Sequence, residues 1–177
     1  MKRVFPRFLV VVASAILLGV LWAAPALADD PRIPLTATPV TLPAGQYCQG
    51  FDAVITFPDF NQYIVRSTTA PDGTVTQQIT GHARATVTNQ VTGKSVSFNI
   101  SGPGTLVFNP DGSFSGDVAG PNLLWTAQDT LPESPKVPTI SYTRGHLTFG
   151  VDASGQTTSY SLAGGNRQTD VCAALAS

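Results

Sequence analysis

The sequence predicts an all-β fold, an antiparallel up-and-down β-barrel of about eight to ten strands, with a β-sandwich as the alternative. Three observations support this prediction. Apolar residues alternate with polar ones at a period of two, as at Ala83, Ala85 and Val87. Turn sequences recur at short intervals, such as Pro-Asp-Gly at residues 71–73 and 110–112. Thr, Val, Ser and Phe are frequent while Glu and Lys are scarce, which favours strands over helices.

The chain begins with a segment that has the pattern of a secretory signal peptide, residues 1–28. Three basic residues precede an uncharged, mostly apolar run that ends at Ala24. Ala26 and Ala28 then supply the small side chains that a signal peptidase requires at the −3 and −1 positions before Asp29. The segment therefore predicts a secreted, extracellular protein.

An uncleaved membrane anchor is the alternative interpretation of this segment, because residues 8–28 approach the roughly 20 apolar residues of a spanning helix. Pro25 favours cleavage, since it breaks a helix just before the Ala-Leu-Ala site. Cleavage leaves 177 − 28 = 149 residues, with no stable membrane anchor. Three of the ten Lys and Arg are removed, so seven cations face eleven anions, a net charge of −4. This balance argues against a nucleic-acid partner.

Cys48 and Cys172 are the two cysteines of the chain. An even count in an exported protein predicts one disulfide between them. Neither cysteine stands in a metal-ligand spacing, so zinc binding and thiolate catalysis are disfavoured.

Two proline-rich segments interrupt the strand pattern. Prolines recur through residues 29–47, which predicts an extended arm that covers a sheet edge or a barrel end. Prolines also recur through residues 129–138, which predicts a loop. The remaining residues 48–177 are expected to form a single barrel domain, with a short helical turn over residues 168–175.

Alternation and turn signals together place the strands along this domain. Two of the predicted strands, 74–80 and 82–89, could alternatively form one long strand that bends at Gly81. The predicted strands are residues 51–57, 61–68, 74–80, 82–89, 95–101, 105–109, 113–119, 122–128, 140–151 and 156–163.

Candidate ligand-binding residues are polar or aromatic side chains within predicted strands, which in a barrel point either into the lumen or into solvent. Asp52 and Asp117 are carboxylates in largely apolar strands, and an inward carboxylate has Arg66, Arg84 or Arg144 as candidate partners. His82 shares a face with Arg84, and His146 shares one with Tyr142 and Arg144, so neighbouring strands would make one polar cluster. The aromatic residues Trp125, Tyr63, Tyr142 and Tyr160 either stack a ligand or fill the core. The candidates that we retain are Asp52, Arg84, Trp125, Tyr142, Arg144 and His146.

Motifs of familiar enzymes are missing from the sequence. It has no Gly-x-Ser-x-Gly elbow, no phosphate-binding Gly-rich loop with Lys and no His-Glu-x-x-His. Two histidines without a third ligand make a poor metal site. We therefore expect no cofactor, no metal and no catalytic residue.

One segment, Gly81-His-Ala-Arg-Ala-Thr-Val-Thr-Asn-Gln-Val-Thr-Gly-Lys-Ser-Val-Ser-Phe-Asn-Ile-Ser-Gly-Pro-Gly104, resembles small secreted proteins of actinobacteria. The resemblance is good over about 24 residues and loose over the rest of the chain, and it implies no activity or site residues to carry over.

These observations predict a secreted, non-enzymatic β-barrel that binds a small apolar ligand or acts as an extracellular interaction module. One alternative is a small barrel enzyme of the cyclase or isomerase type that uses polar lumen residues. Another is an inhibitor of secreted proteases that presents the loop at 129–138, which its prolines would keep rigid.

Overall fold

The computed structural model describes residues 32–127 and 138–176, without the side chains of residues 164–167. The predicted signal peptide and nearly all of the predicted loop at 129–138 lie outside the described residues. The elements are β1 (Ile33–Pro34), β2 (Val40–Leu42), β3 (Ala53–Thr69), β4 (Val75–Asn89), β5 (Ser95–Asn99), β6 (Gly104–Phe108), β7 (Phe114–Trp125), β8 (Ile140–Val151), β9 (Thr157–Asp170) and α1 (Val171–Ala176).

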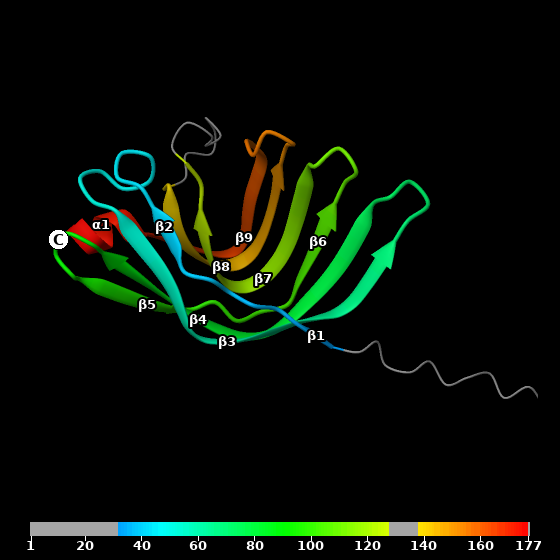
Figure 1. The fold of residues 1–177 in the computed structure, drawn as a ribbon, viewed down its shortest axis with the longest axis horizontal. Helices are drawn as coiled ribbons and strands as arrows, with labels where there is room; N and C mark the ends of the chain where they lie inside the picture. Colours follow the sequence, from blue (N-terminus) through cyan, green and yellow to red (C-terminus); the bar gives the residue numbers. More distant parts are fainter. Residues whose placement is uncertain (1–31, 128–137, 177) are drawn as a thin grey trace, which may run out of the picture.

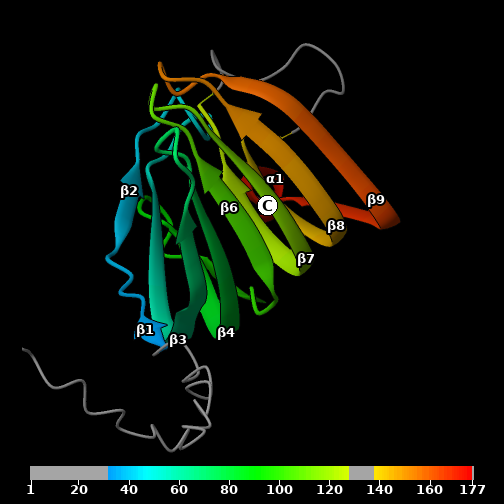
Figure 2. The same cartoon turned by 90° about the vertical axis from the view of Figure 1, so that its right-hand side faces the viewer.

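The strands form one antiparallel sheet in the order β1-β3-β4-β6-β7-β8-β9, with β2 also on β3 and β5 also on β4. The all-β, antiparallel prediction is therefore confirmed. The sheet is not closed by the described strands, because β9 pairs with β8 alone, so the predicted barrel is not confirmed. In Figure 1 the long strands curve into a bowl whose concave side faces the top of the view, and Figure 2 shows β9 at one edge.

Several predicted strands are joined in the structure. The predicted strands at 51–57 and 61–68 are joined in the single strand β3 (Ala53–Thr69), which continues past Pro58 through a bulge between Thr56 and Asp59. β4 passes through Gly81 without a break, as the alternative prediction had it. A Cβ atom at Gly81 would lie 2.2 Å from the carbonyl oxygen of Asn61, so glycine is what allows the two strands to stay this close.

β5 and β6 lie end to end along the same edge of β4. β5 pairs with residues 84–88 of β4, and β6 pairs with residues 75–79. Residues 100–103 bridge them, with the Ile100 amide donating to the Ala83 carbonyl. The chain thus departs from a simple hairpin succession, because one long strand offers room for two short partners.

The sheet divides into two layers beyond this bridge. β6 pairs with residues 114–118 of β7, and the Ala119 amide donates to the Pro103 carbonyl. Past that point β7 remains paired with β8, whereas β5 lies in the other layer. The core fills the space between the layers, where Phe98 of β5 stacks on Tyr142 of β8 with ring centroids 4.5 Å apart.

The core is closed at one end by α1 and the disulfide. Cys48 and Cys172 are bonded, as the sequence predicts, and their Cα atoms are 5.4 Å apart. The predicted helical turn is present as α1, starting at Val171, and Val171 and Leu175 are buried in the core. The N-terminal arm pairs with the edge of β3 through β1 and β2.

Candidate functional site

An aromatic cavity lies where β7 and β8 fold back on themselves. Phe114 and Leu124 are ten positions apart on β7, a distance of about 33 Å in a straight strand, yet both line this cavity of about 120 Å³. Ser141 and Val151, likewise ten positions apart on β8, also both line the cavity. The two strands must therefore bend sharply, which agrees with the curvature in Figure 1. The complete lining is Phe114, Leu124, Trp125, Thr126, Pro138, Ser141, Phe149, Val151, Thr157 and Tyr160.

Glycines make room for this bend and for the aromatic rings. Gly120 of β7 is paired with Gly145 of β8, and both have positive φ angles, 95° and 135°. Gly116 of β7 faces Phe149 of β8, and a Cβ at Gly116 would lie 2.3 Å from the Phe149 ring. A side chain at Gly116 would therefore displace the ring that forms one cavity wall.

Four of the ten residues that line the cavity are aromatic. Phe114 meets Phe149 edge-on with centroids 6.1 Å apart and stacks with Phe108 at 6.0 Å. Phe108 and Trp125 are each 37% exposed, so apolar surface reaches solvent beside the cavity. A site of this kind binds apolar groups through dispersion and the release of water.

Tyr160 brings a polar group into the lining. Burial raises the pKa of its phenol above the usual value, while a hydrogen bond with the Ser141 side chain works in the opposite direction. Gln168 Nε2 also donates to the Tyr160 hydroxyl, at 3.5 Å. The hydroxyl therefore offers orientation to a ligand that is otherwise held by apolar contact.

The size of the cavity limits what it holds. Sites that enclose a drug-sized ligand measure about 300–1,000 Å³. An apolar cavity of about 150 Å³ is known to take up benzene. At about 120 Å³, this cavity fits one ring or a short alkyl group, and it cannot enclose a lipid.

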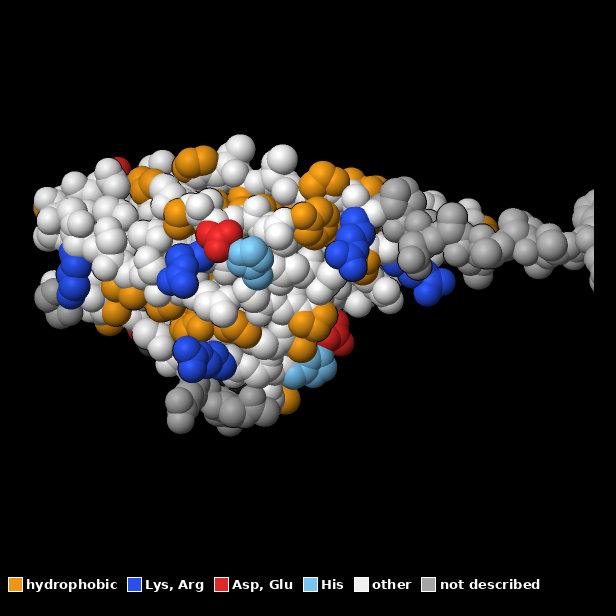
Figure 3. All heavy atoms as spheres, turned by 90° about the horizontal axis from the view of Figure 1, so that it is seen from below, with side chains coloured by type: hydrophobic (Ala, Val, Ile, Leu, Met, Phe, Trp, Pro, Cys, Tyr) orange, Lys and Arg blue, Asp and Glu red, His pale blue; other side chains and the backbone are white. Residues whose placement is uncertain are grey.

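The convex side of the sheet carries both histidines, each beside a carboxylate (Figure 3). His82 Nε2 lies 2.8 and 2.9 Å from the two carboxylate oxygens of Asp59. His146 Nε2 contacts one carboxylate oxygen of Asp117, Oδ1, at 2.5 Å. All four side chains are more than half exposed, so each pair is worth at most about 1 kcal/mol.

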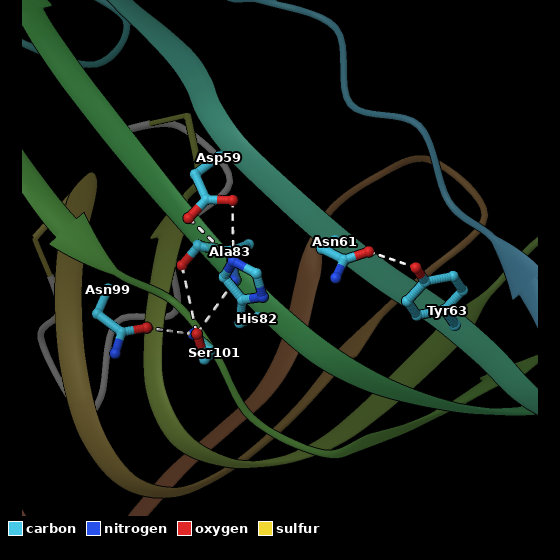
Figure 4. A network of polar contacts seen from close by, with 7 residues as sticks. All are labelled: Asp59, Asn61, Tyr63, His82, Ala83, Asn99 and Ser101. Atoms are coloured by element: carbon cyan, nitrogen blue, oxygen red, sulfur yellow. Dashed lines mark hydrogen bonds and ion pairs between the residues drawn. The ribbon is translucent and has the colours of Figure 1, made fainter.

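Figure 4 shows the surroundings of the His82 pair. The ring points to Asp59, while the nearby Ser101 hydroxyl is engaged with the backbone of Ala83, accepting from its amide at 3.1 Å. The Ser101 amide in turn donates to the Asn99 side chain. The serine hydroxyl is thus tied to the backbone and is not hydrogen-bonded to the imidazole, as a nucleophile would need to be.

β8 carries three of the predicted site residues on one face. Tyr142 is buried against Phe98, and Arg144 Nε donates to the Tyr142 hydroxyl at 3.2 Å. The Arg144 guanidinium also lies 5.5 Å from the Tyr142 ring centroid, which is within cation–π range. His146 follows on the same face beside Asp117. An open, shallow depression adjoins Tyr142 and Arg144, and its floor includes Asn99 and Pro121.

The other predicted site residues lie apart from this face of β8. Asp52 precedes β3, and its Oδ1 accepts the Ala44 amide at 2.7 Å. Arg84 is exposed on β4, opposite Asp59 of β3. Trp125 lines the aromatic cavity. The polar cluster of both histidines is not formed, because β6 and β7 separate β4 from β8.

Sequence reasoning missed Phe114 and Phe149, the two rings at the centre of the cavity. The predicted strands at 113–119 and 140–151 contain them, but the alternation pattern marks neither as a site residue. Their signal is the neighbouring glycines, since Gly116 follows Phe114 by two positions and Gly150 follows Phe149 directly. Sequence reasoning also missed the contact between the Asp59 carboxylate and the His82 ring. A bulge in β3 sets which residue of β3 lies next to His82, and the sequence pattern does not show that bulge.

The described residues contain neither a grouped metal-ligand set nor a membrane-spanning helix. No three His, Cys, Asp or Glu side chains in residues 32–127 and 138–176 are grouped so as to hold a metal ion. Within the same part of the chain, none of the helical structure is long and apolar enough to cross a membrane.

Comparison of the chain with protein-family models, with curated proteins and with solved structures finds no match.

Proposed function

We propose that this protein is a secreted, non-enzymatic binding protein whose aromatic cavity takes a single apolar ring, or a short alkyl group, of an extracellular ligand. The observation that carries the proposal is the cavity between Phe114, Phe149 and Tyr160 in the bend of β7 and β8. The site lies where the open sheet bends, and not in the lumen of a closed barrel. The Cys48–Cys172 disulfide supports the extracellular assignment, because such bonds persist in oxidising compartments.

The geometry favours binding over catalysis. Six of the ten lining residues are apolar, and the polar side chains of the lining are the hydroxyls of Thr126, Ser141, Thr157 and Tyr160, with no charged group among them. The cyclase or isomerase alternative would need Asp52, Arg84 or His146 to converge on a substrate. Asp52 instead accepts the Ala44 amide, and Arg84 and His146 are exposed on the convex side, on strands that are not neighbours. The protease-inhibitor alternative depends on a loop outside the described residues.

Toluene is a suitable probe, because it is one apolar ring of the right size. Titration followed by NMR shifts of cavity residues should saturate with a Kd on the order of 0.1–1 mM, given seven non-hydrogen atoms. Val151→Phe adds a ring to the cavity wall and should abolish binding. Val107→Phe is the matched control, because Val107 is a half-buried valine of β6 outside the cavity lining.

Saturable binding that is lost in Val151→Phe and kept in Val107→Phe supports the site. Binding that does not saturate, or that survives in Val151→Phe, contradicts it. Conversion of a captured ligand into a product would contradict the non-enzymatic assignment.

A further inference from the structure

The four polar side chains that line the aromatic cavity all end in hydroxyl groups. An ionised ligand group would enter this cavity without a counter-charge among the lining side chains, which is costly. A neutral ring with one polar atom suits such a lining, because a few placed polar groups in an apolar pocket fix the orientation and the identity of the ligand.

Two of these hydroxyls form a pair. Ser141 of β8 and Tyr160 of β9 share a hydrogen bond, and the Tyr160 hydroxyl also accepts from Gln168 Nε2 at 3.5 Å. The bend of β8 brings the two hydroxyls together, since the residue of β8 that pairs with Tyr160 is Phe149, eight positions beyond Ser141.

The pair keeps hydrogen-bonding capacity for a ligand. Each hydroxyl carries one hydrogen and two lone pairs. The bond between Ser141 and Tyr160 uses one of the two hydrogens, so one hydrogen is left to donate and lone pairs are left to accept. A ligand hydroxyl, which itself donates and accepts, complements what the pair has left.

We infer, as a refinement that rests on the proposed function, that the aromatic cavity binds a phenol, a ring with one neutral hydroxyl, and that Ser141 and Tyr160 recognise this hydroxyl. Phenol has as many non-hydrogen atoms as toluene, so a cavity of about 120 Å³ that fits one ring accommodates either compound. The two compounds differ in the polar atom, which the hydroxyl pair can contact.

An apolar cavity without hydrogen-bonding groups would select against phenol. The phenol hydroxyl would leave water and find no partner, and a buried hydroxyl without a partner weakens binding about tenfold or more. Ser141 and Tyr160 replace the water contacts that the hydroxyl loses. The unmodified protein should therefore bind phenol at least as tightly as toluene, whereas a cavity without the pair should prefer toluene.

The test compares the Kd values of phenol and toluene by NMR titration at pH 7, where phenol keeps its proton. The double variant Ser141→Ala, Tyr160→Phe removes both hydroxyls of the pair and leaves the side chains close to their original shapes, a change that costs little stability. Its Kd for phenol should rise about tenfold or more. Its Kd for toluene should stay the same, which shows that the cavity is still formed.

Thr143→Val is the matched control. Thr143 lies two positions from Ser141 on β8, so alternation places both side chains on one face of the strand, and both are fully buried. Its hydroxyl has no hydrogen-bond partner within the part of the chain that the structure describes, and the residue is outside the cavity lining. The variant thus deletes a buried hydroxyl of the same strand without changing the cavity, and both Kd values should stay the same.

A phenol ring can reach the cavity from two sources, a small phenolic compound or the tyrosine side chain of a peptide. N-acetyltyrosinamide carries this ring on a peptide backbone and distinguishes the two. A Kd close to that of phenol assigns the ring to a peptide tyrosine, and a Kd about tenfold or more higher assigns it to a free phenol. Either result supports the phenol class.

Phenol that binds at least as tightly as toluene, with this preference lost in the double variant and kept in Thr143→Val, supports recognition of the hydroxyl. Saturable toluene binding with phenol about tenfold weaker overturns it and leaves the proposed function standing. A preference for phenol that survives in the double variant overturns the role of Ser141 and Tyr160. If neither compound saturates the protein, the proposed function fails and the phenol class fails with it.

Discussion

Gly120 of β7 lies directly opposite Gly145 of β8, and both residues have positive φ angles. The pair stands just past the end of the ladder between β6 and β7, at the point where β7 and β8 bend. Non-glycine residues seldom adopt such angles, so two facing glycines mark a bend that the sequence provides for. Because Phe114 and Leu124 lie on either side of Gly120, this bend creates the aromatic cavity.

The first prediction concerns the cost of a side chain at this bend. Gly120→Ala should lower the free energy of unfolding by about 2–3 kcal/mol, because its φ is 95° and a Cβ would lie 3.2 Å from the Ser101 carbonyl oxygen. Gly155→Ala is the control, since Gly155 has a φ of 87° and nothing within 4 Å of a Cβ. It should lose only about 1 kcal/mol. Urea denaturation of both variants checks the difference, and equal losses would show that the close approach does not matter.

The second prediction concerns the disulfide. Cys48 and Cys172 are 124 positions apart, so the bond removes much of the chain entropy of the unfolded state. The double variant Cys48→Ala, Cys172→Ala should be about 5 kcal/mol less stable under the chain-entropy relation. Denaturation of the oxidised protein and of the double variant gives the value directly. A loss below about 1 kcal/mol would mean that the unfolded chain gains little freedom without the bond.

The third prediction concerns alkaline pH. Burial raises the pKa of Tyr160 above its ordinary value of 10.0, so the native state holds the phenolic proton more tightly than the unfolded state does. The resulting stability is present in full below pH 10 and is lost as the pH rises from there through the folded-state pKa. Unfolding free energies between about pH 8 and pH 11 should therefore fall more steeply in the unmodified protein than in Tyr160→Phe. Parallel curves would contradict a raised pKa.

The sequence was a good guide to individual strands with strict alternation. The predicted strand at residues 140–151 matches β8 to the residue, because its turn signals and its pattern agree. The segment at 95–101 is shortened to β5 and that at 105–109 is shifted by one position to β6. Pairing of Cys48 with Cys172 followed from their even number together with the predicted export signal.

Sequence reasoning failed where a strand continued through a residue that usually ends one. Pro58 and Pro121 both look like breaks, yet β3 and β7 run through them. Pro58 falls within the bulge of β3, where the ladder is already interrupted. Pro121 follows Gly120, and past residue 118 β7 has no ladder to β6, so a missing amide on that side costs little.

The sequence by itself determined the class of fold, the strand segments and the disulfide, because alternation, turn chemistry and cysteine count are local properties of the chain. Tertiary structure decided where the sheet divides, which rings meet and which carboxylate each histidine contacts. Phe114 and Phe149 became cavity walls only when β7 and β8 bent at Gly120 and Gly145. Such contacts join residues far apart in the chain, and they depend on strand order and curvature, which no local pattern encodes.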